Sequence, residues 1–251
     1  METERFARYP SLKNTPVIIT GGASGIGEIM VRAFRHQGAE VGFLDRDETR
    51  GTALASETDA RFESCDLRDI PALQAAIARL NAVQGPARVL VNNAAQDDRH
   101  DWRDIDADYW DQNMQTNLRH MFFAIQAVAA DMAKAGGGSI INMGSNSWWE
   151  AGSGFPAYAT AKAAVHGLTR TMARELGGDA IRVNTVVPGW IMTERQKELW
   201  VTPEAIEKHR DRQCLKTLID PVYVARMVLF LASDDAAMCT ANNYMVEAGS
   251  I

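Results

Sequence analysis

The residues in this sequence best suited to proton transfer are a tyrosine and a lysine, in the segment Tyr158-Ala-Thr-Ala-Lys162. The segment is rich in helix formers, and a spacing of four places both side chains on one helix face. A phenol is a poor base at its ordinary pKa of about 10, but an adjacent ammonium group favours the phenolate. The pair could act as an acid/base, although for this spacing alone an exposed tyrosine beside a solvated lysine is the default interpretation.

Two further polar residues could join this pair. Ser145 follows a β-rich run and precedes Tyr158 by thirteen residues. Both could therefore lie at the carboxyl edge of a sheet, where the serine hydroxyl could donate to a substrate oxygen. Asn117 lies within a long helical pattern, where an amide is an unfavourable helix former. It could hold a water molecule near Lys162, or it could cap a turn. These four residues are the predicted catalytic group.

A glycine-rich segment, Thr20-Gly21-x-x-x-Gly25-x-Gly27, lies between a β-rich run and a helical pattern. This is the context in which such a motif binds a dinucleotide. Glycines let the backbone approach the pyrophosphate, while the helix N-terminus supplies free N–H groups and a positive dipole. Ser24 could add a hydroxyl donor. Taken alone, the segment is equally typical of a plain tight turn.

An acidic residue about 20 positions further on strengthens the dinucleotide interpretation. Asp45 ends the second β-rich run, where a carboxylate can accept hydrogen bonds from the adenosine ribose. The same charge repels a 2′-phosphate, so we predict NAD rather than NADP as cofactor. Arg46 could in principle pair with that phosphate. Asp66, at the end of the third run, could accept from the adenine amino group or cap the next helix.

Strand-like and helix-like patterns alternate along the whole chain. The strand-like runs are nearly continuously apolar, which is typical of a parallel sheet covered on both faces. We therefore predict one domain over 1–251, a doubly wound α/β Rossmann fold with a mostly parallel seven-stranded sheet. Residues 191–213 appear irregular and are a predicted substrate lid. The expected strands are 17–20, 40–45, 61–66, 88–92, 139–142, 181–187 and 243–246, and the first helix is expected over 28–37.

Composition excludes several other classes of protein. A net charge of −6 and scattered basic residues give no patch for nucleic acid. No apolar run reaches the roughly 18 residues of a membrane helix, and the charged N-terminus is unlike a signal peptide, so we expect a cytoplasmic protein. The three cysteines are far apart, which argues against a disulfide framework. No Cys/His pair has metal-ligand spacing, so no metal is predicted.

These motifs, taken in order, resemble the short-chain dehydrogenase/reductase family over almost the whole chain. The resemblance includes Asn92-Asn93-Ala94 and Pro188-Gly189 followed by Thr193. It implies that Tyr158 is the acid/base, that Ser145 polarises the reacting oxygen, that Lys162 binds the nicotinamide ribose and tunes Tyr158, and that Asn117 supports a water relay. Ala95 and Ala241 stand where the family usually has glycine. The expected cofactor contacts are Gly21, Ser24, Gly25, Ile26, Gly27, Asp45, Asp66, Leu67, Asn93, Ala94, Tyr158, Lys162, Pro188, Gly189, Ile191 and Thr193.

The substrate side resembles bacterial aldose dehydrogenases of this family, those acting on xylose and similar sugars, in the strings 93–100, 117–121, 144–148, 193–196 and 213–216. The resemblance implies NAD-dependent oxidation of an aldose at its anomeric carbon to a lactone. The alternatives are a keto-sugar, sugar acid, polyol or 3-oxoacyl substrate, and a non-catalytic nucleotide sensor. The helices over 107–135 and 156–176 are expected to pair in a homotetramer. The expected substrate contacts are Arg99, Ser145, Asn146, Trp148, Trp149, Tyr158 and Trp190. Packing or subunit contact is an equal alternative for the tryptophans, and a solvated loop is the default interpretation of Arg99. Glu150, in the loop after Ser145, could pair with sugar hydroxyls or be a helix-start charge.

Overall fold

A seven-stranded sheet forms the frame that positions these residues. The computed structural model of the chain describes residues 5–250, and its strands lie in the order β3-β2-β1-β4-β5-β6-β7. The predicted single-domain α/β fold is confirmed, and every neighbouring pair of strands is parallel. The strands are β1 (Pro16–Thr20), β2 (Glu40–Asp45), β3 (Arg61–Ser64), β4 (Val89–Asn92), β5 (Gly138–Met143), β6 (Ile181–Pro188) and β7 (Asn243–Val246).

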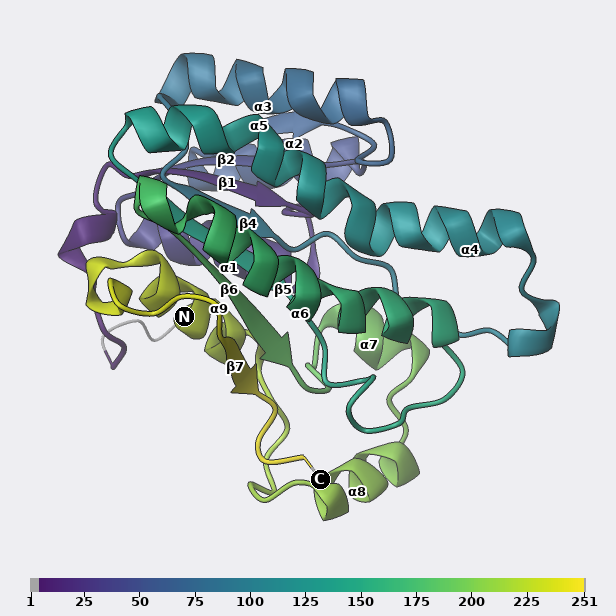
Figure 1. Cartoon of the computed structure of the whole chain (residues 1–251). Helices are drawn as coiled ribbons and strands as arrows, with labels where there is room; N and C mark the ends of the chain where they lie inside the picture. Colours follow the sequence, from purple (N-terminus) through teal and green to yellow (C-terminus); the bar gives the residue numbers. More distant parts are fainter. Residues whose placement is uncertain (1–4, 251) are drawn as a thin grey trace.

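Helices cover both faces of the sheet (Figure 1). Successive strand residues point to opposite faces, so Ile19 of β1 packs toward α1 and α9, and Ile18 packs toward α3 and α5. Both faces are therefore apolar, which explains why the strands show no alternation in the sequence. One layer contains α1 (Gly25–His36), α2 (Glu48–Thr58) and α9 (Pro221–Ala232); the other contains α3 (Ile70–Gln84), α5 (His120–Lys134) and α6 (Pro156–Leu176).

The strand order reverses beside β1. From β1 the chain continues to β2 and β3 on one side, and then crosses to β4 on the other side. Connections diverge at such a switch point and leave a crevice beyond the carboxyl ends of the strands. Thr20 ends β1, Asp45 ends β2 and Asn92 ends β4, so the predicted cofactor residues gather at this edge.

The helix predicted over 107–135 is interrupted. It consists of α4 (Ala107–Met114), a π-helical turn (Gln115–Arg119) and α5. Asn117 therefore lies in a widened turn, not in regular α-helix. Such single π turns are frequent at functional sites.

The predicted irregular lid, 191–213, contains two short helices, α7 (Glu194–Leu199) and α8 (Pro203–Arg212). Each has a threonine N-cap: Thr193 accepts from Gln196 N–H at 3.3 Å, and Thr202 accepts from Ala205 N–H at 3.1 Å. The description of this stretch as irregular was wrong because α7 is short and α8 is polar on all sides. Neither helix carries the apolar stripe from which a helix is recognised.

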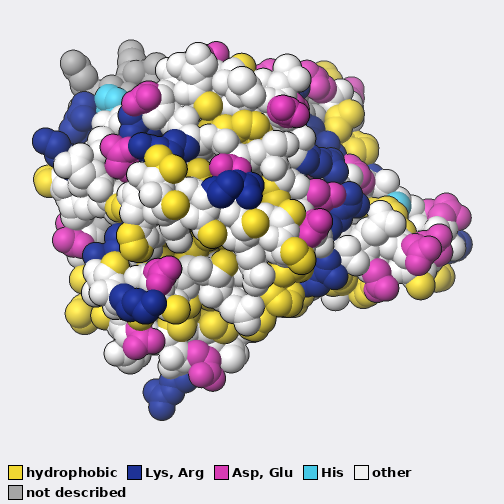
Figure 2. Space-filling model, turned by 90° about the horizontal axis from the view of Figure 1, so that it is seen from above, with side chains coloured by type: hydrophobic (Ala, Val, Ile, Leu, Met, Phe, Trp, Pro, Cys, Tyr) yellow, Lys and Arg dark blue, Asp and Glu magenta, His cyan; other side chains and the backbone are white. Residues whose placement is uncertain are grey.

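The surface carries charges of both signs in mixture, as the view from above shows (Figure 2). The segment containing the 3-10 turn Trp102–Asp104 and the start of α4 projects from the body and is rich in acidic side chains (Figures 1 and 2). No helix within 5–250 combines the length and the apolar character needed to cross a membrane.

Candidate active site

A cleft of about 1790 Å³ opens at the carboxyl edge of the sheet. The loops after β1 to β6 line it, and both lid helices contribute side chains. These loops come from distant parts of the sequence, and the sheet brings them together. Because the cleft extends from the glycine-rich segment to Tyr158 and Trp190, it is long enough to accept a dinucleotide and a second molecule side by side.

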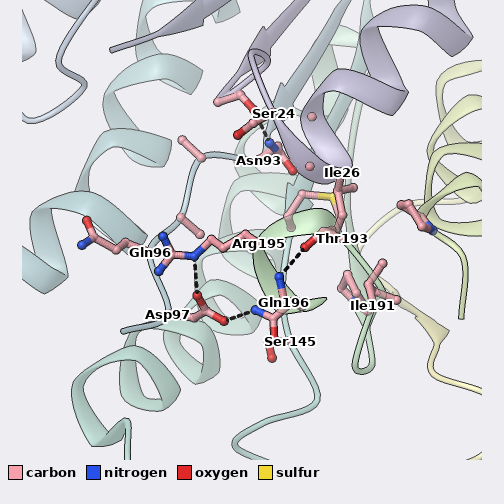
Figure 3. A pocket seen from close by; sticks show the side chains of 18 of the residues that line it. Ser24, Ile26, Asn93, Gln96, Asp97, Ser145, Ile191, Thr193, Arg195 and Gln196 are labelled. Carbon is pink, nitrogen blue, oxygen red and sulfur yellow. Dashed lines mark hydrogen bonds and ion pairs between the residues drawn. The ribbon is translucent and has the colours of Figure 1, made fainter. Parts of the chain in front are cut away.

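The glycine-rich segment forms one end of the cleft. Gly25 has a φ of +58°, and a Cβ on Gly27 would lie 1.9 Å from the Gly21 carbonyl oxygen. The first turn of α1 includes Gly25 and Gly27, so the helix begins three residues before the predicted start. Ser24 is the N-cap residue, but its hydroxyl makes no cap hydrogen bond and it faces the cleft (Figure 3). The helix N–H groups and this hydroxyl are placed to bind an anionic group.

The end of β4 is fastened to this segment. The Thr20 hydroxyl accepts from Asn93 N–H at 3.0 Å and from Ala94 N–H at 3.2 Å. The Asn93 side chain donates to the carbonyl of Gly21 at 2.8 Å. A Cβ on Gly21 would lie 2.7 Å from Ala94 Cα. Asn93 and Ala94 line the cleft as predicted, and the Asn93 amide is used to hold the glycine-rich segment.

Asp45 lies where the sequence placed it, at the end of β2. Its carboxylate accepts from Ala23 N–H at 3.0 Å and from Asp47 N–H at 3.1 Å. These two bonds hold the negative charge beside the glycine-rich segment. Arg46 is exposed at the rim of the same cleft.

Asp66 and Leu67 line the cleft after β3. Asp66 pairs with Arg68 at 2.6 Å, and the hydrogen bond from that guanidinium holds the pKa of the carboxyl below its usual range. The alternative interpretation of Asp66 as a helix cap is wrong. Asp69 caps α3 instead, by accepting from Ala72 N–H at 3.0 Å.

Tyr158 and Lys162 both reach the cleft from α6. Lys162 is buried, and its Nζ donates to the Met143 carbonyl at 2.8 Å and lies 5.7 Å from the centre of the Tyr158 ring. Burial lowers the pKa of Lys162 to about 7, and the charge of Asp97 opposes this. The lysine is thus enclosed between the end of β5 and the tyrosine.

The protein groups around Tyr158 favour the neutral phenol. Burial raises the pKa of Tyr158 above its ordinary value, and the negative charge of Asp97 adds to the rise. The Ser145 hydroxyl and the Arg99 guanidinium act in the opposite direction. The sequence predicted that Lys162 would lower the pKa of Tyr158. In the structure the pKa is raised instead, because the effect of burial is larger than that of the nearby charges.

Asn117 is buried behind the cleft and does not line it. Its side-chain oxygen accepts from Gln96 N–H at 2.8 Å, and its amide donates to the Gln96 carbonyl at 3.1 Å and to Asn113 Oδ1 at 2.9 Å. The side chain fastens the π-helical turn to the loop after β4. These bonds join the amide to protein groups, and the predicted role of Asn117 in holding a water near Lys162 stays a prediction.

Of the predicted substrate contacts, Arg99, Ser145, Asn146, Tyr158 and Trp190 line the cleft. Trp148 and Trp149 do not line it, and their role as substrate contacts stays a prediction beside the alternative of packing or subunit contact. A tight turn, in which the N–H groups of Trp149 and Glu150 both donate to the Asn146 carbonyl, turns the two indoles outward. Trp148 donates to His166 Nε2 at 3.0 Å, and Trp149 is 64% exposed.

Glu150, which the sequence placed in a loop near Ser145, lines the cleft. Glu150 accepts from the Asn146 amide and the Ser250 hydroxyl and pairs with Arg212 at 3.2 Å. Other cleft residues were not among the predicted contacts; they follow β4 or β5 or lie in the lid: Asp97, Phe155, Arg195, Gln196 and Trp200. Position was the available signal, because each of these residues follows the carboxyl end of a strand or lies in the predicted lid.

A glycine-rich anion site and a Ser–Tyr–Lys group on one Rossmann sheet are the features of a dinucleotide-dependent oxidoreductase. The family model described as enoyl-(acyl carrier protein) reductase matches residues 21–250. The chain belongs to the short-chain dehydrogenase/reductase family, whose dehydrogenases use a nicotinamide cofactor.

Particular relatives resemble nearly the whole chain. The D-xylose 1-dehydrogenase of Caulobacter vibrioides is 48% identical over 97% of this chain and 98% of its own. A probable galactose dehydrogenase of Rhizobium meliloti is 43% identical, with 97% of each chain covered. Among solved structures, a short-chain type dehydrogenase/reductase from Mycobacterium ulcerans has a TM-score of 0.91 at 25% identity, covering 95% of this chain and 90% of its own. A 3-oxoacyl-[acyl-carrier protein] reductase from Brucella melitensis has a TM-score of 0.89 at 30% identity, covering 96% of this chain and 93% of its own.

Proposed function

We propose that this protein oxidises the anomeric carbon of an aldose to a lactone, with NAD as the hydride acceptor. The observation that carries the proposal is the chemistry of the cleft beside Tyr158 and Ser145. An amide, a carboxylate, a guanidinium and an indole line it, from Asn146, Glu150, Arg99 and Trp190. Polar groups can pair with sugar hydroxyls, and an indole can cover an apolar ring face. The similarity to xylose and galactose dehydrogenases supports the same substrate class.

The residues present fit a dinucleotide. The absence of space for a Cβ on Gly27 and the open N-terminus of α1 suit a pyrophosphate. Thr193 lies over Gly25, since a Cβ there would be 3.6 Å from the threonine methyl. We assign the adenosine ribose to Asp45, the adenine end to Asp66 and Leu67, the nicotinamide ribose to Tyr158 and Lys162, and the carboxamide to Ile191 and Thr193, with Pro188 and Gly189 beside them.

The cofactor, when bound, supplies a two-electron hydride acceptor. Tyr158 takes the proton of the anomeric hydroxyl onto its phenolate oxygen, while the anomeric carbon loses its hydrogen as hydride. Ser145 donates a hydrogen bond to that oxygen as it becomes a carbonyl. Lys162, enclosed between the end of β5 and Tyr158, binds the nicotinamide ribose, and Asn117 keeps the loop after β4 in place. The lactone then hydrolyses to an aldonic acid.

Oxidation should therefore accelerate as the pH rises. The base is active only as the phenolate, and the pKa of Tyr158 is raised by burial. A raised pKa moves the rising part of the pH profile toward alkaline values, so little activity is expected in acid.

The 3-oxoacyl alternative draws support from the Brucella reductase, which shares the fold. Charged groups near Tyr158 disfavour it, because Asp97 and Glu150 would lie against an apolar acyl chain. We therefore place it second.

An absorbance assay for NADH tests the proposal. D-xylose and D-galactose should each be tried with NAD and NADP, and the polyols xylitol and galactitol serve as matched controls because they lack an anomeric carbon. We expect turnover with an aldose and NAD and little with either polyol. Turnover of polyols or a 3-oxoacyl thioester, with inert aldoses, would contradict the proposal.

A further inference from the structure

A turn directly after Ser145 fixes the amide side chain of Asn146 in the cleft. The Asn146 carbonyl accepts from the N–H groups of Trp149 and Glu150, at 2.9 and 3.0 Å. Its own N–H donates to the Pro188 carbonyl, at the end of β6, at 3.2 Å. Asn146 is only 8% exposed and lines the cleft next to Ser145. The amide therefore lies beside the residue to which we assign the reacting oxygen.

The carboxylate of Glu150 decides which end of this amide faces the cleft. Asn146 Nδ2 donates to Glu150 Oε1. An ionised carboxylate can only accept hydrogen bonds, so the NH2 end of the amide must be the end that faces Glu150. The other end, Asn146 Oδ1, accepts no hydrogen bond from any residue in the described range 5–250 and is open to the cleft. The cleft thus has a free acceptor beside Ser145.

Two further contacts hold Glu150 itself. Its Oε1 also accepts from the Ser250 hydroxyl, and its Oε2 pairs with Arg212 of α8 at 3.2 Å. The chain after β7 runs back to the end of α8 (Figure 1), where Cys214 N–H donates to the Gly249 carbonyl at 2.9 Å. The Glu150 side chain is only 13% exposed. Both oxygens of the carboxylate have protein partners, which suits it to hold a neighbouring group in place.

The anomeric carbon of a cyclic aldose has two unlike neighbours in the ring. One is the ring oxygen, which carries no hydrogen and can only accept, and the other is carbon 2, whose hydroxyl can donate. A free acceptor next to Ser145 can pair with that hydroxyl but not with the ring oxygen. Asn146 Oδ1 therefore favours one of the two ways in which the ring can lie with its anomeric hydroxyl on Ser145 and Tyr158.

We propose that Asn146 is a specificity-determining residue that accepts a hydrogen bond from the hydroxyl on carbon 2 of the aldose, and that Glu150 is the positioning residue that orients its amide. This inference rests on the proposed sugar oxidation and names the hydroxyl that the site requires. A sugar without a donor on carbon 2 leaves the acceptor of Asn146 unpaired, so its kcat/KM falls.

Paired sugars test this hydrogen bond. D-galactose and D-xylose are each compared with the 2-deoxy-2-fluoro analogue, which has a similar shape but no donor on carbon 2. The ratio of kcat/KM for the sugar to that for its analogue should fall by about 3- to 10-fold in Asn146→Ala, as expected for one neutral hydrogen bond. The electronic effect of fluorine on the reaction is the same in both enzymes and cancels from this comparison.

A remote hydroxyl provides the control for Asn146→Ala. D-fucose lacks only the 6-hydroxyl of D-galactose, so the ratio of kcat/KM for these two sugars should not change. A purely structural role of Asn146 would lower kcat/KM for the sugar and its fluoro analogue equally. An equal loss of that kind would overturn the proposal.

Glu150→Gln tests the positioning role. The new amide can donate or accept, so it no longer holds Asn146 in one orientation, and the same ratio should fall by about 2- to 5-fold. The double variant Asn146→Ala/Glu150→Gln should match Asn146→Ala alone, since Glu150 acts only through Asn146. Glu207→Gln is the matched control, because it removes one charge from an exposed position of α8 outside the cleft. An unmoved ratio in Glu150→Gln, or an effect that persists without Asn146, would refute the positioning role.

A binding measurement separates this inference from the proposed reaction. The Kd of each sugar for the enzyme–NADH complex, read from the change in NADH fluorescence, needs no turnover. A preference for the sugar over its fluoro analogue that Asn146→Ala removes, in an enzyme that does not oxidise aldoses, would refute the sugar oxidation alone. Oxidation of aldoses with one ratio in all variants would refute the inference alone. A complex that binds neither D-galactose nor D-xylose, in an enzyme that does not oxidise them, would refute both.

Discussion

Removing the negative charge of Asp45 should weaken the preference for NAD over NADP. The carboxylate is fixed by hydrogen bonds from the N–H groups of Ala23, at 3.0 Å, and Asp47, at 3.1 Å. It therefore cannot swing away from a 2′-phosphate on the adenosine ribose. Asp45→Asn removes the charge and keeps the shape of the side chain and one of its two accepting oxygens, so it tests the electrostatic contribution with a small change of structure.

The expected magnitude follows from the openness of the site. Two unit charges 4 Å apart repel by about 1 kcal/mol in water and by about 4 kcal/mol at an effective dielectric constant of 20. Asp45 is only partly buried, so about 1–2 kcal/mol is expected. Since 1.4 kcal/mol corresponds to a factor of ten, the ratio of kcat/KM for NADP to that for NAD should rise by about 5- to 30-fold.

Steady-state kinetics with both cofactors, at one saturating sugar concentration, measure this ratio. Asp47→Asn is the matched control. It removes one charge from the same loop, but Asp47 caps α2 by accepting from Arg50 N–H at 3.0 Å and is not bonded to the glycine-rich segment. Its ratio should change by less than about twofold. An unchanged ratio in Asp45→Asn, or an equal rise in both variants, would refute the reasoning.

Three further predictions concern the base, the backbone and the assembly. Tyr158→Phe should lower kcat by about 10²- to 10⁴-fold while NAD still binds by calorimetry; near-native turnover would identify another base. Ala241 has a φ of +61°, and this left-handed conformation costs an alanine about 1–2 kcal/mol. A glycine variant would remove that cost but lose about 0.4–1 kcal/mol to the greater entropy of its unfolded chain. Ala241→Gly should therefore raise Tm by about 1–4 °C, whereas Ala78→Gly, on an exposed position of α3, should lower it; a lower Tm for Ala241→Gly would contradict the strain. Sedimentation should show a homotetramer, and a stable monomer at micromolar concentration would refute it.

Much of the fold could be predicted because burial on both faces of a parallel sheet leaves continuous apolar runs. The glycine-rich segment was predictable because its steric requirement is local: Gly27 has no space for a Cβ. Helix α8 was not predictable from an apolar stripe, since none of its residues is buried. An apolar pattern in the sequence indicates that one face of a helix is buried, and neither lid helix has a buried residue.

The site was predicted less completely because orientation depends on tertiary contacts. One turn at Asn146 decides that Glu150 faces the cleft while Trp148 and Trp149 face outward. The pKa of Tyr158 moves opposite to the expectation from its neighbour Lys162, because burial opposes ionisation. Neither effect can be read from residue spacing.

The identity of the product formed from an aldose tests the central claim most directly. The protein, NAD and D-xylose or D-galactose should be incubated together, and the carbon skeleton followed by NMR while NADH is measured by absorbance. The account predicts one NADH for each aldose converted, with the lactone appearing first and the aldonic acid after it. NADH formed without oxidation at the anomeric carbon, or formed only from a polyol or a 3-hydroxyacyl substrate, would contradict it.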